Sequence, residues 1–416
     1  MVNNRGRRFF TVILFAAVFF VTAAFPAAAQ EGPHRIVEVG FDLDVALANN
    51  MAGLGDVFNA RKAVVLDFRK LRVTDITAWA GAEAGFFVNV NPRDSLSFGV
   101  FAGVDGAGEL WLSQDLVRLL KEGNFRTRSI EGSMTLGAAA FAQAGLNAAF
   151  PIKKLRITVR PEVYMPLFYI PPPDFSYALT MDEDTGSITL AVGGGAELYS
   201  AMSLEEGAGM DIFGSGAPSI GADLSAGVEY SLLPKWDVGL TLTHIPVVPS
   251  SLNHRARISL ELTKKDSDEP YQIDSIYDSL TGDSLTLPDF KTKTTYDDRS
   301  LTVLRPLRLD LFAEYRPLGI DLFTVRPNIG LSFLTIYGGS HISVNFGLEG
   351  RINLLRCIFI GLSTALREEV WRQSFSFGLN FRAVEFNLGL SLAGTDFLSS
   401  FNGKGVGVRA GLRLGY

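Results

Sequence analysis

Cysteine is almost absent from this chain of 416 residues, in which Cys357 is the only one. A single thiol excludes an internal disulfide and a zinc site built on paired cysteines. Histidine is scarce too: there are 4, and none has a serine or acidic partner at a recognisable spacing. We therefore expect no enzyme, no cofactor and no metal site.

Long apolar runs and an excess of positive charge are also missing. After the first two dozen residues no apolar run reaches the ~18 residues that a membrane helix needs, although 47% of the chain is hydrophobic. Lys and Arg total 38 against 44 Asp and Glu. Nucleic acid recognition requires a basic surface, so no nucleic acid partner is expected. Glycine is plentiful, with 42 residues and no G-X-Y period, which excludes a collagen-like chain.

The first 29 residues have the three parts of a secretory signal peptide. Three arginines come first, an apolar run from Phe9 to Phe25 follows, and Pro26–Ala29 supplies small residues before an expected cut after Ala29. The mature domain is then 30–416. Export without cysteine pairs fits a bacterial envelope protein.

The rest of the chain alternates between apolar and small or polar residues. The last segment is the clearest: Val406, Val408, Ala410, Leu412, Leu414 and Tyr416 alternate with glycine and arginine. Period two places the two sets on opposite faces of a strand. Several segments reach ten residues or more, longer than the strands of a soluble sandwich and long enough to cross a bilayer. We predict an all-β chain that forms one antiparallel transmembrane β-barrel.

Six short links set the strand count. They are 91–94, 151–154, 233–235, 317–320, 355–356 and 382–384. Outer-membrane barrels have short periplasmic turns, long outer loops and an even strand number. We expect 14 strands, at 35–48, 75–91, 94–105, 130–150, 155–170, 218–232, 236–244, 301–316, 322–337, 341–354, 357–367, 371–381, 384–393 and 405–416.

The alternative count is 16 strands. It requires a candidate hairpin, 175–183 with 187–200, to join the wall instead of an outer loop. Another candidate strand, 254–264, precedes an acidic outer loop at 265–299. Apolar residues at helical spacing predict short helices in the first two outer loops, over 56–71 and 114–123.

Charged residues recur at positions that alternate with the apolar ones, and so face the lumen. A ring of such charges can set the selectivity of a pore; equally, they can pair with one another and hold a narrow barrel shut. Both interpretations stay open. The lumen candidates are Arg160, Glu162, Arg308, Asp310, Glu314, Arg326, Glu349, Arg351, Arg409 and Arg413.

The signal peptide, the chain-long alternation and the terminal Tyr416 resemble those of bacterial outer-membrane β-barrel proteins. That resemblance implies an outer-membrane location, contact with its lipid, and Tyr416 as the signal read by the barrel assembly machinery. Size and strand number also resemble the fatty-acid transporter (FadL-like) group and uncharacterised barrel families of spirochaetes and Bacteroidetes. Only Gln30–His34 precede the first expected strand, too few for that group's N-terminal hatch, so a plug would come from the first or second loop.

These patterns favour a porin-like channel or transporter that passes small solutes, hydrophobic or lipid-like ones included, through a charged lumen. The alternative is a closed structural barrel whose outer loops bind a partner.

Overall fold

The fold is described from a computed structural model of the whole chain. The residues that the structure describes are 35–50, 74–93, 96–115, 117–118, 129–172, 175–181, 188–201, 219–265, 291–318, 322–334, 341–354, 357–367, 369–381 and 383–416. The expected signal peptide, 1–29, lies outside them.

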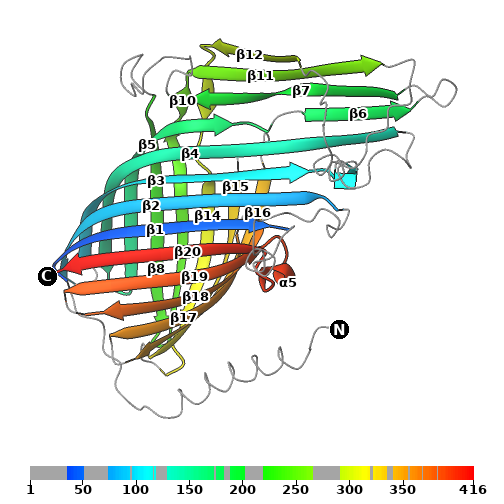
Figure 1. Ribbon diagram of the computed structural model, residues 1–416. Helices are drawn as coiled ribbons and strands as arrows, with labels where there is room; N and C mark the ends of the chain where they lie inside the picture. The colour runs from blue at the N-terminus through cyan, green and yellow to red at the C-terminus, as the bar shows by residue number, and fades with distance from the viewer. Residues whose placement is uncertain are drawn as a thin grey trace, which may run out of the picture.

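Fourteen antiparallel strands form a closed barrel (Figure 1). Each pairs with the next along the wall, and β20 pairs with β1 to close the circle. The expected count of 14 is confirmed. The wall strands are β1 (Val37–Asn49), β2 (Ile76–Arg93), β3 (Leu96–Leu112), β4 (Ser129–Ile152), β5 (Leu155–Ile170), β8 (Gly221–Leu233), β9 (Trp236–Val248), β14 (Leu307–Tyr315), β15 (Phe323–Leu334), β16 (His341–Leu354), β17 (Ile358–Arg367), β18 (Val370–Asn380), β19 (Val384–Gly394) and β20 (Gly405–Gly415).

The strand ends that the six short links join lie at one end of the barrel, which we call the turn end; the other is the loop end. The start of β1 and the end of β20 also meet at the turn end, where Ile36 N–H donates to the Tyr416 carbonyl at 2.6 Å and Tyr416 N–H donates to Val37 at 3.0 Å. Backbone groups at the seam are therefore paired, as a barrel in lipid requires.

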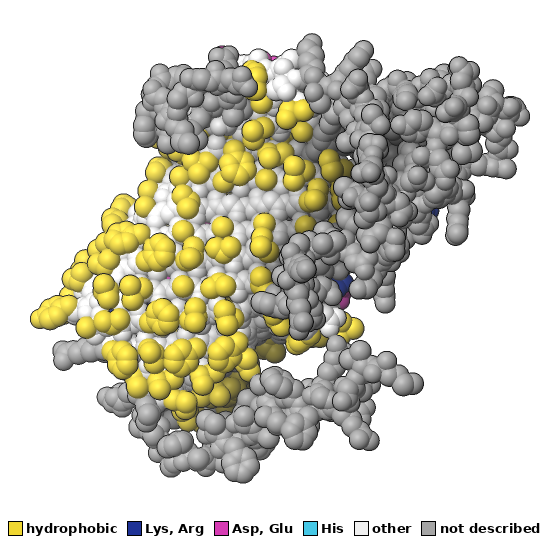
Figure 2. Space-filling model, in the orientation of Figure 1, with side chains coloured by type: hydrophobic (Ala, Val, Ile, Leu, Met, Phe, Trp, Pro, Cys, Tyr) yellow, Lys and Arg dark blue, Asp and Glu magenta, His cyan; other side chains and the backbone are white. Residues whose placement is uncertain are grey.

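Apolar side chains cover the outside of the wall (Figure 2). On each strand they occupy every second position, as period two predicts. On β19, for example, Phe386, Leu388 and Leu390 are exposed, whereas the alternate Glu385 lies inside the barrel and binds Arg35. In water such a surface would be unfavourable, so it is a lipid-facing belt.

A four-stranded branch of the same sheet extends from the wall at the loop end. It contains β6 (Phe175–Met181), β7 (Ile188–Ser200), β11 (His254–Lys265) and β12 (Lys291–Asp297). β6 pairs with the outer part of β4, and β7, β11 and β12 continue from it. The candidate hairpin therefore lies outside the barrel wall, which excludes 16 strands. β12 falls inside 265–299, so this range is not loop throughout.

The expected strand 301–316 is wrong in its first half. β13 (Leu301–Val303) instead pairs with β10 (Ser250–Leu252) in a separate two-stranded sheet, and β14 begins only at Leu307. Pro306 has no N–H to give to a wall ladder, so the chain leaves the wall there. The two short strands pack against β5 in a hydrophobic cluster of Ala139, Phe141, Tyr164, Tyr169, Tyr199, Leu252 and Val303.

Helix is rare in the described residues. In the second loop Gln114, Asp115, Val117 and Arg118 are helical, at the start of the expected 114–123; the first expected helix, 56–71, lies outside the described residues. In the last loop, α5 (Phe397–Ser400) was not expected. No helix among the described residues is long and apolar enough to cross a membrane.

The short helix α5 folds back over the outward face of the wall. Ser400 is fully buried, and its hydroxyl accepts a hydrogen bond from the Gln373 side chain of β18 at 3.0 Å. A side chain at Gly394 would overlap Ser399, so glycine makes room for the helix. Leu398, by contrast, is 73% exposed. α5 therefore turns its serines to the barrel, packs Phe397 edge-to-face on Trp371 of β18, and leaves Leu398 outward.

Candidate functional site in the barrel lumen

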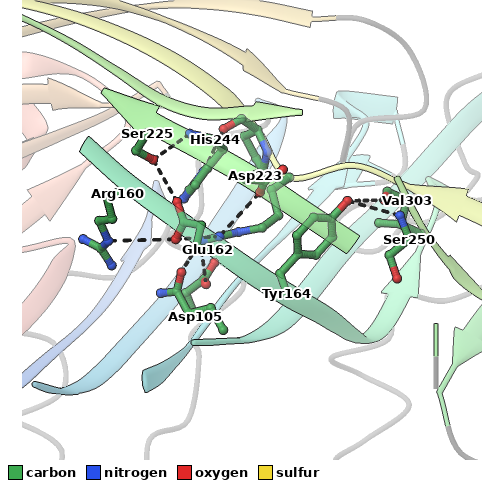
Figure 3. A network of polar contacts seen from close by, with 12 residues as sticks. Asp105, Arg160, Glu162, Tyr164, Asp223, Ser225, His244, Ser250 and Val303 are labelled. Atoms are coloured by element: carbon green, nitrogen blue, oxygen red, sulfur yellow. Dashed lines mark hydrogen bonds and ion pairs between the residues drawn. The ribbon is translucent and has the colours of Figure 1, made fainter. Parts of the chain in front are cut away.

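An arginine from the segment between β13 and β14 enters the barrel. The Arg305 side chain is 1% exposed and contacts carboxylates from three wall strands (Figure 3). Its guanidinium lies 3.2 Å from Glu162 on β5, 3.6 Å from Asp223 on β8 and 3.4 Å from Asp105 on β3. One residue between β13 and β14 thus connects the neighbouring strands β5 and β8 with β3, which lies on the far side of β4.

The carboxylates of this network have further partners. Ser225 donates to Glu162 at 2.8 Å, and the Arg160 side chain lies 4.0 Å from the same carboxylate. The Tyr164 hydroxyl donates to the carbonyl of Val303 at 3.1 Å, which ties β13 to β5. A charge removed from water is tolerated only with such partners. This side of the lumen is therefore filled by an ion-pair network.

The wall is irregular beside the network. His244 on β9 has a φ of 59°, in the left-handed region, directly after the last β9–β14 pair, Thr243 with Arg308. Its N–H bonds the Ser225 hydroxyl at 3.1 Å, and its ring Nδ1 lies 3.0 Å from the carbonyl of Pro306. We call the residues between β13 and β14, 304–306, the inner segment. The contacts of His244 thus hold the inner segment in place where it joins β14.

The opposite side of the lumen holds a cavity of about 450 Å³. It is lined by residues of β1, β9 and β14 to β20, and most, though not all, of these side chains are polar. Inward glycines leave room for it: Asn328 lies across Gly347, and Ser376 across Gly361. The charged residues of the lining are Asp44, Asp310, Arg326, Glu349, Arg367, Arg372 and Arg409.

Inward arginines stack on inward aromatic rings. Arg326 lies 4.1 Å from the ring centre of Phe312, Arg351 lies 4.0 Å from that of Phe359, and Arg160 lies 3.6 Å from that of Phe101. A cation over a ring face is attracted by about 0.5–2 kcal/mol. The rings thus hold these guanidinium groups close to the wall.

The predicted lumen residues separate into three groups. Arg160 and Glu162 belong to the buried network, and Asp310, Arg326, Glu349 and Arg409 line the cavity. The rest lie elsewhere on the inner wall. Arg308 lies opposite Ser332, Glu314 binds Arg316, Arg351 bonds Asn353, and Arg413 lies near Glu38 and Glu385.

Tyr416 closes the seam through its backbone, while its side chain is 89% exposed.

Sequence reasoning missed three members of the network: Asp105, Asp223 and Arg305. The two aspartates lie at inward positions of the alternation, which was a usable signal. For Arg305 there was no such signal in the sequence, because the alternation of apolar and polar residues assigned Arg305 to a continuous wall strand. Within the described residues no group of three His, Cys, Asp or Glu is placed to hold a metal ion.

The chain matches no protein-family model and no curated protein. Solved structures similar to it include the toluene transporter TodX of Pseudomonas putida, with a TM-score of 0.46 and 9% identity over 93% of this chain and 91% of that one. Another is the monoaromatic hydrocarbon channel CymD, with a TM-score of 0.43 and 9% identity over 93% of this chain and 89% of that one. A third is a FadL homologue of Pseudomonas aeruginosa, with a TM-score of 0.40 and 10% identity over 92% of this chain and 90% of that one. The 14-stranded barrel itself rests on this chain's own strand pairing.

Proposed function

We propose that this protein is an outer-membrane channel for small water-soluble solutes, which pass along the cavity side of the lumen. The observation that carries the proposal is the polar cavity of about 450 Å³ inside a closed, lipid-facing barrel. Serine, asparagine, arginine and carboxylate side chains replace the hydration of a polar solute, whereas a hydrocarbon would gain nothing from them. The lining therefore favours water-soluble solutes over the hydrophobic ones that the sequence left open.

Location and partners belong to the same proposal. The apolar belt would contact outer-membrane lipid after removal of 1–29, and β20 with the following Tyr416 would be read by the barrel assembly machinery. No catalytic role is proposed.

The test is the conductance of the refolded protein in a planar bilayer at neutral pH, with an empty bilayer as control. We expect discrete, stable openings. Arg305→Ala should enlarge them, because the inner segment loses its anchor to β3, β5 and β8. The control is Arg118→Ala, which removes an exposed ion pair with Asp115 in the second loop and should leave conductance unchanged.

A closed structural barrel is the second candidate, and the buried Arg305 network favours it. A folded protein that shows no openings, and gains none in Arg305→Ala, would support this candidate over the channel.

A further inference from the structure

A row of polar side chains runs from strand to strand along the wall of the cavity. Ser363 on β17, Ser374 on β18 and Ser391 on β19 lie directly opposite one another in the strand register. Glu349 on β16 continues the row, because its register partner on β17 is Ser363. All four residues line the cavity. Four neighbouring strands therefore present three hydroxyl groups and a carboxylate at one level of the lumen.

Glycines leave hydroxyl groups of this wall uncovered. Ser376 lies opposite Gly361 on one side and Gly389 on the other, and neither of these neighbours has a side chain to cover its hydroxyl. The hydroxyl of Ser391 lies over Gly407, where a Cβ would overlap it. Within the described part of the chain no hydrogen bond is formed by the hydroxyl groups of Ser363, Ser374, Ser376 and Ser391. Their capacity to donate and accept hydrogen bonds is therefore available to a molecule in the cavity.

Two carboxylates of the lining are available as well. Neither Asp310 nor Glu349 forms an ion pair of 4.0 Å or less with another described residue. Arg326, the register partner of Glu349, stacks on Phe312 instead. An ionised carboxylate only accepts hydrogen bonds, so these two positions require solute groups that donate.

We propose that the cavity binds neutral polyols, solutes that carry several hydroxyl groups and no charge. Each solute hydroxyl donates to a carboxylate or a serine and accepts from a serine, and the bonds to Asp310 and Glu349 are charge-assisted. An anion is repelled by the two carboxylates. A small cation engages the carboxylates alone and leaves the serine row unused. The inference deepens the proposed function and rests on the same cavity.

The test compares xylitol, which has a hydroxyl on every carbon, with triethylene glycol, which has nearly the same mass but ether oxygens in place of most hydroxyls. At neutral pH xylitol should reduce the potassium current through the reconstituted protein in a concentration-dependent way. Triethylene glycol should reduce it much less, because an ether oxygen cannot donate to a carboxylate.

Two variants test the row itself. Ser374→Ala removes its middle hydroxyl, and Glu349→Gln replaces a charged acceptor by a neutral one; each should raise the xylitol concentration for half-block several-fold. Ser231→Ala is the matched control, because Ser231 lies on β8 at the turn end and is absent from the cavity lining; it should leave the block unchanged. A current blocked by tetramethylammonium but not by xylitol would indicate a cation site and overturn the proposal.

Calorimetric titration of the folded protein in micelles with xylitol separates the two proposals. A silent barrel that binds xylitol but not triethylene glycol, and loses binding in Ser374→Ala, would overturn the channel and keep the polyol site. Openings that both solutes reduce equally, with no heat of binding, would overturn the polyol site and keep the channel.

Discussion

The ring of Phe312 on β14 lies across Gly239 on β9, its neighbour in the wall, so that any Cβ at Gly239 would overlap the end of the ring. The same relationship joins Phe87 to Gly40 and Phe359 to Gly378. Each ring lies on the wall instead of projecting into the lumen. Glycine therefore decides how much of the barrel interior stays open.

Replacement of this glycine should destabilise the barrel. Gly239→Ala forces Phe312 off the wall, and overpacking of this kind costs about 1–3 kcal/mol of unfolding free energy. Gly227→Ala on β8 is the control, because its Cβ would meet nothing closer than the Thr241 hydroxyl at 3.6 Å. Urea unfolding in vesicles measures both; equal stabilities would show that the ring moves aside without cost.

Loss of Arg305 should cost more than loss of an exposed arginine. Arg305→Ala leaves Glu162 and Asp223 buried without their counter-charge, and breaking a buried pair costs about 3–5 kcal/mol. The double change with Glu162→Gln should recover part of that loss, since one uncompensated charge is removed. The free energies of unfolding of the two single variants and of the double variant form a double-mutant cycle. If the losses of the two single variants simply added up in the double variant, a direct interaction between Arg305 and Glu162 would be contradicted.

The apolar face of α5 should lie in lipid. We expect a fluorescent probe at Leu398→Cys, in a Cys357→Ser background, to be quenched by brominated lipids. The reason is that α5 packs its serines on Gly394 and Gln373 and leaves Leu398 facing outward beside the apolar belt. A probe at Asn402→Cys, in the turn after α5, is the comparison. Equal quenching at both sites would place α5 away from the lipid surface.

The start of α5 should resist acid. The Ser399 backbone N–H donates to Asp396 at 2.8 Å and lowers the pKa of that carboxyl below its usual value. The ionised Asp396 stabilises the helix fully at pH values above the pKa that an aspartate has in the unfolded chain, about 3.9. This stabilisation is lost as the pH falls through the lower pKa that Asp396 has in the folded protein. The emission of the Leu398→Cys probe should stay constant from neutral pH to about 5 and change only in stronger acid. Asp396→Asn should abolish the change; a transition near neutral pH would exclude Asp396 as its cause.

The sequence alone determined the barrel. In β19 and β20 the alternation of apolar and polar residues is compatible only with strands that have one face toward lipid. The six short links determine which consecutive strands pair with each other. These are local signals, with periods of two residues and turns of a few, so a count of 14 strands, with 16 as the alternative, could be made without coordinates. The pairing of β6 with β4 then excluded 16. The inward direction of Arg160, Glu162, Arg326 and Glu349 followed from the same period.

Only the tertiary structure decided what those inward residues meet. Arg305 leaves the wall because Pro306 cannot continue the ladder, and its partners lie on β3, β5 and β8, far away in sequence. Whether a lumen charge becomes buried or lines a cavity depends on how the closed barrel brings distant strands to face one another. Asp223 and Asp310 occupy equivalent inward positions in the alternation, yet the first is paired with Arg305 and the second lines the cavity, since the inner segment covers only one side of the lumen.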